Sequence, residues 1–364
     1  MANIHLVMAA VVVVLLVSLS STSTSASASA ISTKQQKQSL RFSEKGEFRI
    51  LQVADMHYAD GKTTPCKDVL PQQFEGCSDL NTTAFLRRII AAVKPHLIVF
   101  TGDNIFGLDA KDAVYSLNAA FSPAVSSDIP WAAVLGNHDQ ESTLSRAGVM
   151  KHIVGMKHTL SQFNPPEVDN IDGFGNYNLE VRGVEGSAFE NKSVALFNIF
   201  CALGRGKLKD LAQYFVLRAY KNKPEAQEAP APGLAYFHIP LPDFASFDSS
   251  NFTGVKQQGI GSASVNSGFF TTMAEAGDVK AVFVGHDHIN DFCGELAGIH
   301  LCYGGGFGYH AYGKAGWDRR ARVVAASLEK TENGGWGGVK SIKTRKHLDN
   351  QLLTAVDAQV LWSH

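Results

Sequence analysis

Short apolar runs alternate along this chain with segments of helical periodicity, and this alternation limits the possible folds more than any other feature. Residues 48–55, 97–103 and 130–139 form the first three runs, FRILQVAD, LIVFTGD and PWAAVLGNHD, and each has the length of a strand. Residues 83–96 and 110–125 lie between them and carry apolar side chains at helical spacing. Strands that alternate with helices indicate an α/β architecture of packed layers.

The pattern changes after Gly173, where the segments resemble antiparallel strands. We expect further helices over 142–154 and 267–278, and further strands over 175–183, 193–200, 233–240, 279–288, 299–306, 321–330 and 338–345. The sequence contains no internal repeat and no linker long enough to divide two domains. We therefore expect a single domain over residues 47–362.

The N-terminal segment has the pattern of a secretory signal peptide. Residues 5–20 are apolar apart from His5 and two serines, and the small residues Ala28-Ser29-Ala30 follow. We therefore predict a signal peptide over 1–30, a polar leader over 31–46 and a secreted, extracellular protein. The positively charged region expected before the apolar run has only His5 and no Lys or Arg, so an uncleaved anchor is the alternative.

Glycosylation motifs and composition agree with a secreted globular protein. Asn-x-Ser/Thr motifs begin at Asn81, Asn191 and Asn251, and we predict these three residues as glycosylation sites. Of the 364 residues, 45% are hydrophobic and 18% are charged, which is ordinary for a globular chain. The formal net charge of -1 gives no overall field for nucleic acid or an anionic membrane. We expect neither a nucleic-acid partner nor stable membrane association after signal cleavage.

Five cysteines fit an oxidising compartment. Cys66 with Cys77 and Cys293 with Cys302 could close two local loops, although the pairing cannot be deduced from sequence. Cys201 would then remain without a partner.

Polar side chains follow five of the predicted strands, at the point where each strand ends. In order, these are Asp55 and His57, then Asp103, then Asn137 with His138 and Asp139, then His238, and finally His286 with His288. Ligands of open α/β sheets gather outside the carboxyl ends of strands. Oxygen and imidazole ligands without thiolate suit Fe, Zn, Mn or Mg. We therefore expect a two-metal centre in which the two oxygens of Asp103 bridge the ions.

Each motif also has a plainer explanation when it is taken alone. Gly-Asp after an apolar strand is common in ordinary turns, and a single histidine such as His238 is more often a hydrogen-bonded strand-end residue than a ligand. Gly-Asn-His-Asp and Gly-His-Asp-His are rarer. Chance assembly of all five motifs at successive strand ends is improbable, so we favour the metal centre.

The ordered motifs Asp-x-His, Gly-Asp, Gly-Asn-His-Asp, His and Gly-His-x-His resemble the calcineurin-like metallophosphoesterase superfamily. The segments 230–254, 285–296 and 305–317 further resemble the small plant purple acid phosphatases, including the type often labelled inactive. The resemblance covers roughly residues 45–362. It implies a four-layer α-β-β-α sandwich of two mixed sheets, with helices on both outer sides.

The resemblance also implies roles for the matching residues. One metal ion would be held by Asp55, His57, Asp103 and His288, and the other by Asp103, Asn137, His238 and His286. His138 would donate a proton to the leaving group or stabilise the transition state, and Asp139 would orient His138. The implied activity is that of a secreted phosphatase of the acid phosphatase type, with Fe and Zn, Mn or Mg as ions. It would hydrolyse phosphomonoesters of small molecules by attack of metal-held hydroxide.

The sequence departs from the purple acid phosphatases in two places. Those enzymes carry a Tyr three residues after the bridging Asp, whose phenolate binds ferric iron, and this chain has Phe106 there. They also have Gly where this chain has His57, so one ligand is lost and another is gained. Residues 197–213, FNIFCALGRGKLKDLAQ, do not match the strand ending in Asp-Ser-Gly-Asp that relatives carry. A mispredicted exon or true divergence would explain this segment.

Two alternatives to the phosphatase remain open. One is a catalytically weak or inactive extracellular metal-binding relative, and the other is a phosphodiesterase or pyrophosphatase of the same superfamily. The glycine-rich stretch 303–313 lacks the spacing of a dinucleotide site, and a structural role is favoured for His310 over substrate contact. No Gly-x-Ser-x-Gly motif occurs, so Ser-His-Asp hydrolysis is unsupported.

Overall fold

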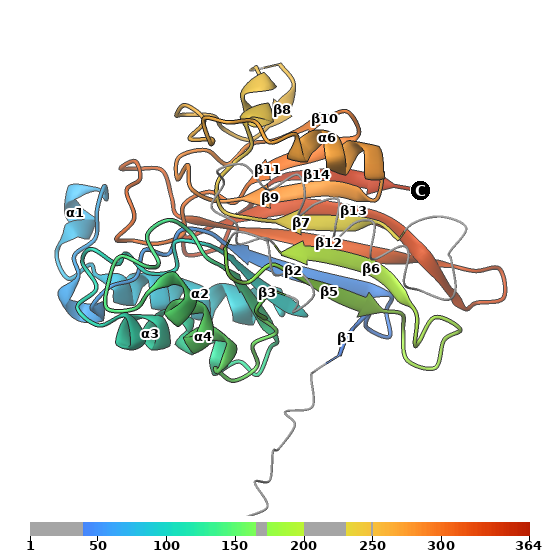
Figure 1. Ribbon diagram of the computed structural model, residues 1–364, viewed down its shortest axis with the longest axis horizontal. Coiled ribbons are helices and arrows are strands. Elements are labelled where there is room, and N and C mark those ends of the chain that lie inside the picture. Colours follow the sequence, from blue (N-terminus) through green and yellow to red (C-terminus); the bar gives the residue numbers. More distant parts are fainter. Residues whose placement is uncertain (1–38, 165–172, 200–230, 249) are drawn as a thin grey trace, which may run out of the picture. The chain divides into compact units, whose positions relative to one another are not determined.

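Two mixed β-sheets form the centre of the fold and carry the predicted metal-binding segments (Figure 1). The computed structural model describes residues 39–164, 173–199, 231–248 and 250–364. The predicted signal peptide over 1–30 lies outside the described residues, as do Cys201 and most of the segment 197–213.

The six-stranded sheet contains the first three predicted strands as parallel neighbours. Its strands, in spatial order, are β14 (Ala355–Ser363), β13 (Trp336–Leu348), β12 (Arg320–Lys330), β2 (Glu47–Val53), β3 (Leu97–Thr101) and β4 (Trp131–Val134). The β2–β3 and β3–β4 pairs are parallel, whereas the pairs from β2 to β14 are antiparallel. The carboxyl ends of β2, β3 and β4 therefore meet at one edge of the sheet.

The eight-stranded sheet brings the two later histidine motifs to the carboxyl ends of neighbouring strands. Its strands, in spatial order, are β1 (Leu40–Arg41), β5 (Tyr177–Arg182), β6 (Ser193–Ile199), β7 (Gly233–Tyr236), β9 (Val279–Val284), β11 (Ile299–Tyr303), β10 (Cys293–Leu296) and β8 (Phe252–Thr253). β5 and β6 are antiparallel, as predicted, and β7 and β9 are parallel neighbours.

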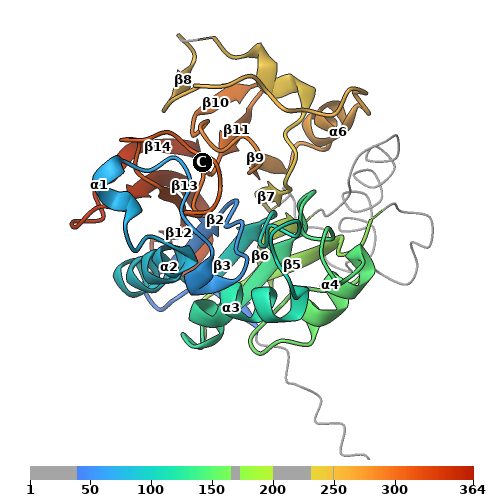
Figure 2. The same cartoon turned by 90° about the vertical axis from the view of Figure 1, so that its left-hand side faces the viewer.

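Helices cover the outer faces of the sheets, so the predicted four-layer arrangement is confirmed. The helices are α1 (Pro71–Phe74), α2 (Asp79–Val93), α3 (Ala113–Val125), α4 (Arg146–Val154) and α6 (Phe269–Ala276), with short 3-10 turns η1 (Gly61–Thr63) and η2 (Pro242–Ser246). α2 packs on β2 and contacts α3, which contacts α4, while α6 packs on β9 (Figures 1 and 2). Among the described residues, no helix is both long and apolar enough to cross a membrane.

One apolar core joins the inner faces of the two sheets. It includes Ile50 and Val324, which share the Gln52 face of the six-stranded sheet, and Tyr236 and Phe283 from the eight-stranded sheet. The buried Gln52 side chain on β2 also donates a hydrogen bond of 3.1 Å to the carbonyl of Val284 on β9. This hydrogen bond connects β2 with β9 near their carboxyl ends, next to the polar motifs.

The fold begins earlier in the chain than the sequence analysis placed it. Leu40 and Arg41 form β1, which pairs in parallel with β5, and Phe42 is only 2% exposed. Residues 39–46 therefore belong to the fold, and the predicted leader over 31–46 is wrong for this part. Two apolar residues in a polar stretch are too weak a signal to predict an edge strand.

The cysteines pair as the two local loops that the sequence allowed. Cys66 is bonded to Cys77, and Cys293 on β10 is bonded to Cys302 on the neighbouring strand β11. Two disulfides indicate an oxidising compartment.

The three predicted glycosylation sites differ in their surroundings. Asn191 and Asn251 are exposed. Asn81 lies in the first turn of α2, where its Oδ1 accepts a hydrogen bond from the Ser78 backbone N–H as part of a capping box. Glycosylation stays a prediction at all three.

The buried Asp79 at the start of α2 makes stability depend on pH. Its Oδ2 accepts hydrogen bonds from the backbone N–H groups of Ala59 (2.8 Å) and Gly61 (3.1 Å), but burial raises its pKa from 3.8 to about 6. Because the folded-state pKa lies above the unfolded one, this group stabilises the fold at low pH, and that contribution is lost as the pH rises through 6.

We expect Asp79→Asn to remove this pH dependence. Between about pH 4.5 and about pH 7.5, the free energy of unfolding of the wild type should fall by about 2 kcal/mol relative to the variant, since one pKa unit corresponds to about 1.36 kcal/mol. Urea unfolding of both proteins at the two pH values measures this change. A difference between the two proteins that stays constant with pH would contradict it.

Candidate metal centre

The seven predicted ligands follow the carboxyl ends of five strands. Asp55 and His57 follow β2, Asp103 follows β3, Asn137 follows β4, His238 follows β7, and His286 and His288 follow β9. All of them except the half-buried Asn137 and His286 are buried. The parallel order of these strands within each sheet brings the side chains to one place.

The first group consists of Asp55, His57, Asp103 and His288. One ligand atom from each of the four lies within 4.8 Å of the others. His57 Nε2 is 3.4 Å from Asp103 Oδ2, and His288 Nε2 is 3.5 Å from Asp55 Oδ1. The structure therefore brings together all four residues that were predicted to hold one ion.

The second group consists of Asp103, His238 and His286, with Asn137 beside them. His238 Nε2 lies 3.1 Å from Asp103 Oδ2 and 3.1 Å from Asn137 Oδ1. His286 Nδ1 lies 3.3 Å from the same His238 nitrogen. Asp103 belongs to both groups, as expected for a bridging carboxylate.

Buried carboxylates and histidines shift one another's pKa values within the cluster. Burial lowers the pKa of His57 to about 4, so its imidazole is neutral near pH 7. Burial acts to raise the pKa of Asp103, but the neighbouring His238 and His57 hold it well below its usual value. Burial likewise acts to lower the pKa of His238, but the carboxylates of Asp103 and Asp55 raise it to about 9, so this imidazole is protonated near pH 7 when no cation is bound, and a cation would have to displace that proton. The cluster therefore combines anionic oxygens with imidazole nitrogens.

One buried atom gives a direct test of whether these residues fit a metal ion. Nε2 of His57 approaches Asp103 Oδ2 at 3.4 Å but makes no well-formed hydrogen bond within the described part of the chain, and its side chain is only 5% exposed. A buried polar atom without a partner is costly unless something else binds it. Because this nitrogen faces Asp103 and lies within the first group, a cation ligated by these residues would satisfy it.

The backbone at the ligands is strained. Asp55, His57, Asp103 and His286 all adopt positive φ values, of 56°, 45°, 47° and 73°. Such conformations are uncommon for residues other than glycine and gather at functional sites. Here they turn the chain sharply after each strand, so that side chains from different strands point at one another.

The chain also packs so closely at the cluster that two positions require glycine. A Cβ atom at Gly136 would lie 2.1 Å from Asp103 Oδ1, and one at Gly102 would lie 2.5 Å from His238 Nδ1. Gly102 also has a φ of 90°. Any side chain at either position would displace a ligand.

His138 lies beside the cluster, but its predicted partner was wrong. His138 Nδ1 is 2.5 Å from Glu141 Oε2, and the His138 backbone N–H donates to Asp103 Oδ1 at 2.8 Å. Asp139 instead accepts hydrogen bonds from the backbone N–H groups of Gly136, Asn104 and Ile105, and from the Asn104 side chain. Asp139 is buried, and within the described part of the chain its hydrogen bonds all go to the loops after β3 and β4 and none to the His138 ring.

Glu141 was missed, although it lies only three residues after His138. The predicted ligands all lie just after strand ends, whereas Glu141 lies further along the chain from the end of β4. A carboxylate three residues after a histidine can contact it within a turn, so this spacing could have indicated the Glu141–His138 contact.

Phe106 faces the site where a purple acid phosphatase would have its tyrosine. The ring centroid is 5.3 Å from that of His57 and 4.9 Å from that of His138. Lys67 Nζ lies 4.7 Å from the same centroid. Phe106 therefore has the expected position but offers no oxygen to a metal ion.

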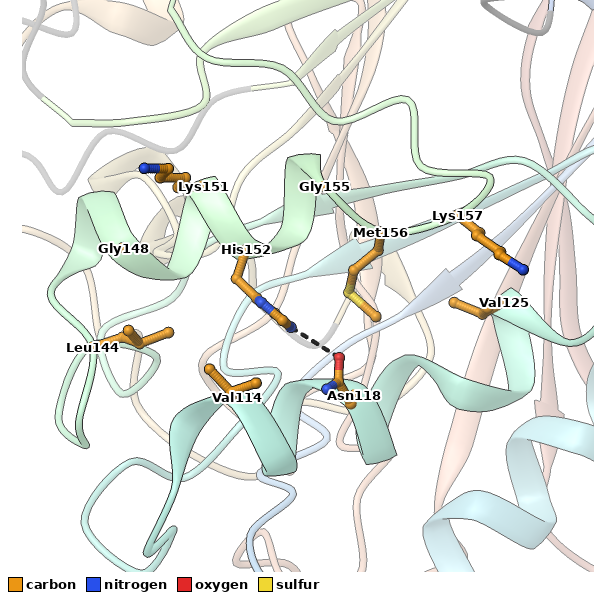
Figure 3. A pocket seen from close by; sticks show the side chains of 10 residues that line it. All are labelled: Val114, Asn118, Val125, Leu144, Gly148, Lys151, His152, Gly155, Met156 and Lys157. Carbon is orange, nitrogen blue, oxygen red and sulfur yellow. Dashed lines mark hydrogen bonds between the residues drawn. The ribbon is translucent and has the colours of Figure 1, made fainter. Parts of the chain in front are cut away.

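Two histidines outside the cluster, His310, for which a structural role was predicted, and His152, have ordinary partners. His310 is 3% exposed, and its ring nitrogens bind the Pro65 carbonyl and Asp109 Oδ2, both at 2.8 Å. His152 Nε2 binds Asn118 Oδ1 at 2.8 Å within a groove between α3 and α4 (Figure 3). This groove has a volume of about 650 Å³, and none of the predicted ligands lines it.

Comparisons with known proteins agree with the geometry. A family model described as calcineurin-like phosphoesterase matches residues 48–290. "Probable inactive purple acid phosphatase 29" of Arabidopsis thaliana is 59% identical over 354 residues, covering 92% of this chain and 90% of that protein. "Phosphatase DCR2" of Saccharomyces cerevisiae is 30% identical over 319 residues, covering 82% of this chain and 55% of that protein.

Solved structures share the fold at low sequence identity. A dimetal phosphatase from Danio rerio has a TM-score of 0.50 and 14% identity, covering 87% of this chain and 99% of that chain. The purple acid phosphatase PPD1 from yellow lupin seeds has a TM-score of 0.52 and 12% identity, covering 87% of this chain and 54% of that chain. At these identities the likeness establishes the arrangement of sheets and helices.

Proposed function

Because the chain belongs to the calcineurin-like phosphoesterase family, we propose that it is a catalytically weak, extracellular metal-binding relative of the phosphatases. Two ions would be held by the two groups of ligands, one by Asp55, His57, Asp103 and His288, and the other by Asp103, Asn137, His238 and His286. The observation that carries this proposal is the convergence of these side chains, with the buried Nε2 of His57 facing Asp103 Oδ2 at 3.4 Å without a well-formed hydrogen bond.

The surrounding residues retain parts of a hydrolytic site. Bound ions would make a water molecule more acidic and stabilise negative charge on phosphate oxygens. The ring of His138 is partly exposed beside the ligands, and Glu141 binds its Nδ1. This contact leaves Nε2 to donate a proton to a leaving oxygen of a small phosphorylated substrate. Asp139 and Gly136 hold the loop that carries His138.

Two observations support weak rather than strong catalysis. Phe106 cannot supply the phenolate that stabilises ferric iron in purple acid phosphatases, so we expect the site to hold divalent ions and the loaded protein to be colourless. The name of the Arabidopsis relative also describes that protein as probably inactive, and this chain is 59% identical to it.

A fully active phosphomonoesterase is the second candidate. The complete set of ligands and the position of His138 favour it, and a yeast relative is named a phosphatase. A phosphodiesterase or pyrophosphatase activity is the third candidate, because the ligands determine where a phosphate binds and not what is attached to it. For any of the three, the two disulfides and the apolar N-terminal run support a secreted protein.

The proposal is tested by metal content and turnover of the full chain. We expect about two divalent ions per chain by elemental analysis, with slow release of phosphate from an aryl phosphate. His57→Phe keeps a ring in the same space, so we expect it to lose one ion while the stability of the metal-free protein changes by less than about 1.5 kcal/mol. Absence of metal from the wild type contradicts the proposal, and rapid turnover supports the second candidate.

A further inference from the structure

Tyr312 lies directly against the ligand His288, in the segment between β11 and β12. The two rings are stacked, with centroids 3.8 Å apart and an interplanar angle of 17°. Within the stretch 303–313, only His310 was considered from the sequence. The structure instead places Tyr312 of this stretch in contact with the cluster.

The backbone carbonyl of Tyr312 determines which nitrogen of His288 can bind a metal. It lies 2.9 Å from His288 Nδ1, and since a carbonyl oxygen only accepts, this nitrogen must carry the hydrogen. In the tautomer with hydrogen on Nδ1 alone, Nε2 presents its lone pair, and this is the atom that faces Asp55 Oδ1 at 3.5 Å. Hydrogen bonds of this kind orient metal-binding histidines and fix their tautomer.

The phenol of Tyr312 holds the backbone of the same loop. Its hydroxyl accepts a hydrogen bond of 3.2 Å from the His288 backbone N–H and donates to the His286 carbonyl (3.3 Å) or to Gln258 Oε1 (3.2 Å). Gln258 Nε2 also donates to the hydroxyl at 2.8 Å. The ring, the hydroxyl and the carbonyl of Tyr312 therefore all contact the short segment that contains His286 and His288.

Arg319 holds the Tyr312 carbonyl in place. This side chain is 5% exposed, and its Nη1 donates to the Tyr312 carbonyl at 3.1 Å. Its Nη2 donates to the carbonyls of Ala311 (2.9 Å) and Lys67 (2.8 Å). The planar guanidinium is suited to several acceptors at once, and a lysine ammonium does not reproduce this arrangement.

We propose that Tyr312 and Arg319 are positioning residues that fix the orientation and tautomer of His288, and that they thereby strengthen metal binding selectively in the group formed by Asp55, His57, Asp103 and His288. The proposal rests on the proposed binding of metal ions. The proposed role differs from a general structural role because Tyr312 contacts the second group, with His238 and His286, only through the hydrogen bond from its hydroxyl to the His286 carbonyl. The two groups should therefore respond differently to substitution.

The experiment is a Zn²⁺ titration of the full chain, monitored by calorimetry and by ¹⁵N NMR of the histidine rings. The NMR signals distinguish binding at His288 from binding at His238. We expect Arg319→Lys and Tyr312→Leu to weaken Zn²⁺ binding at the His288 group by about tenfold or more, with binding at the His238 group unchanged. Tyr312→Phe retains the stacked ring and the carbonyl, so it should have a smaller effect.

Tyr309→Phe is the matched control, because it removes a phenolic hydroxyl from the same segment and keeps the ring. The Tyr309 hydroxyl donates to Asp349 Oδ2 at 2.7 Å and does not contact His288. We expect it to leave both groups unchanged. Equal weakening of both groups by Arg319→Lys, or no weakening at all, would overturn the proposal.

A measurement without metal keeps this proposal separate from the proposed function. In the metal-free wild type, the NMR spectrum should show hydrogen on Nδ1 of His288, and in Arg319→Lys it should show a mixture of tautomers. Hydrogen on Nε2 in the wild type would overturn the positioning role. A wild type that shows the expected tautomer but binds no Zn²⁺ would contradict the proposed function and not the orientation of His288.

Discussion

Asp103→Asn is expected to remove metal from both groups of ligands. One carboxylate oxygen of Asp103 lies 3.4 Å from His57 Nε2 and 3.1 Å from His238 Nε2, so a single side chain serves both groups. The amide has nearly the same shape and can still accept the hydrogen bond from the His138 N–H, but it lacks the negative charge that offsets two cations. Metal content should fall below one ion per chain. Any phosphate release should fall by more than about 100-fold, since even the outer partners of ligands account for about 10–100-fold.

Asp128→Asn is the matched control for this substitution. Asp128 also has a positive φ, of 57°, and its carboxylate lies 3.1 Å from His158 Nε2, but its side chain is 85% exposed on the surface. Exposed ion pairs of this kind contribute little to stability. The control should therefore keep both ions and all activity. If Asp103→Asn also kept two ions, Asp103 would not be the bridging ligand.

The layers of the fold could be predicted because each core strand has a strong local signal. The runs 97–103 and 279–288 are apolar over the length of a buried strand, and both are strands in the structure. The short edge strands β1 and β8 have only two residues each, and their pairing partners lie far away in sequence. Nothing within such a short segment distinguishes it from a loop, so the start of the fold was placed too late.

The convergence of the candidate ligands could be predicted, because the order of the strands in the sheets determines which strand ends lie together. Parallel neighbouring strands place their carboxyl ends together, so a polar residue just after each strand must lie near the others. The convergence of Asp55, Asp103 and His288 could therefore be predicted without knowing their side-chain torsion angles. The arrangement of all four residues of the first group agrees with this prediction.

The residues around the ligands could not be found in this way. The roles of Asp139, Glu141 and Tyr312 depend on the conformation of short loops and not on strand order. Asp139 and Glu141 are two residues apart, yet one turns toward backbone N–H groups and the other toward His138. A prediction based on residue type alone assigned the wrong carboxylate to the histidine.

The backbone strain at the ligands connects metal binding with stability. Positive φ values at residues such as Asp55, His57 and Asp103 cost about 1–3 kcal/mol each. A ligand that binds only the folded state stabilises it by mass action. Metal ions at this cluster would therefore offset part of the strain, and the metal-free protein should be the less stable form.

Asp139→Ala is expected to destabilise the metal-free protein by about 3 kcal/mol or more, because it leaves several buried donors without an acceptor. One oxygen of Asp139 accepts from the Asn104 N–H (2.9 Å) and the Ile105 N–H (3.0 Å). The other accepts from the Gly136 N–H (2.7 Å) and the Asn104 side chain (3.2 Å). The carboxylate thus joins the loop after β3 to the loop after β4.

Urea unfolding in the presence of a chelator measures this effect without any contribution from metal. Asp318→Ala removes an exposed carboxylate and should change the free energy of unfolding by about 0.5 kcal/mol or less. The measurement also separates the two roles considered for Asp139. If Asp139 only oriented His138, Asp139→Ala would be as stable as the control and would affect turnover alone. We expect the loss of stability, because Asp139 binds the backbone of two loops and the ring of His138 is held by Glu141.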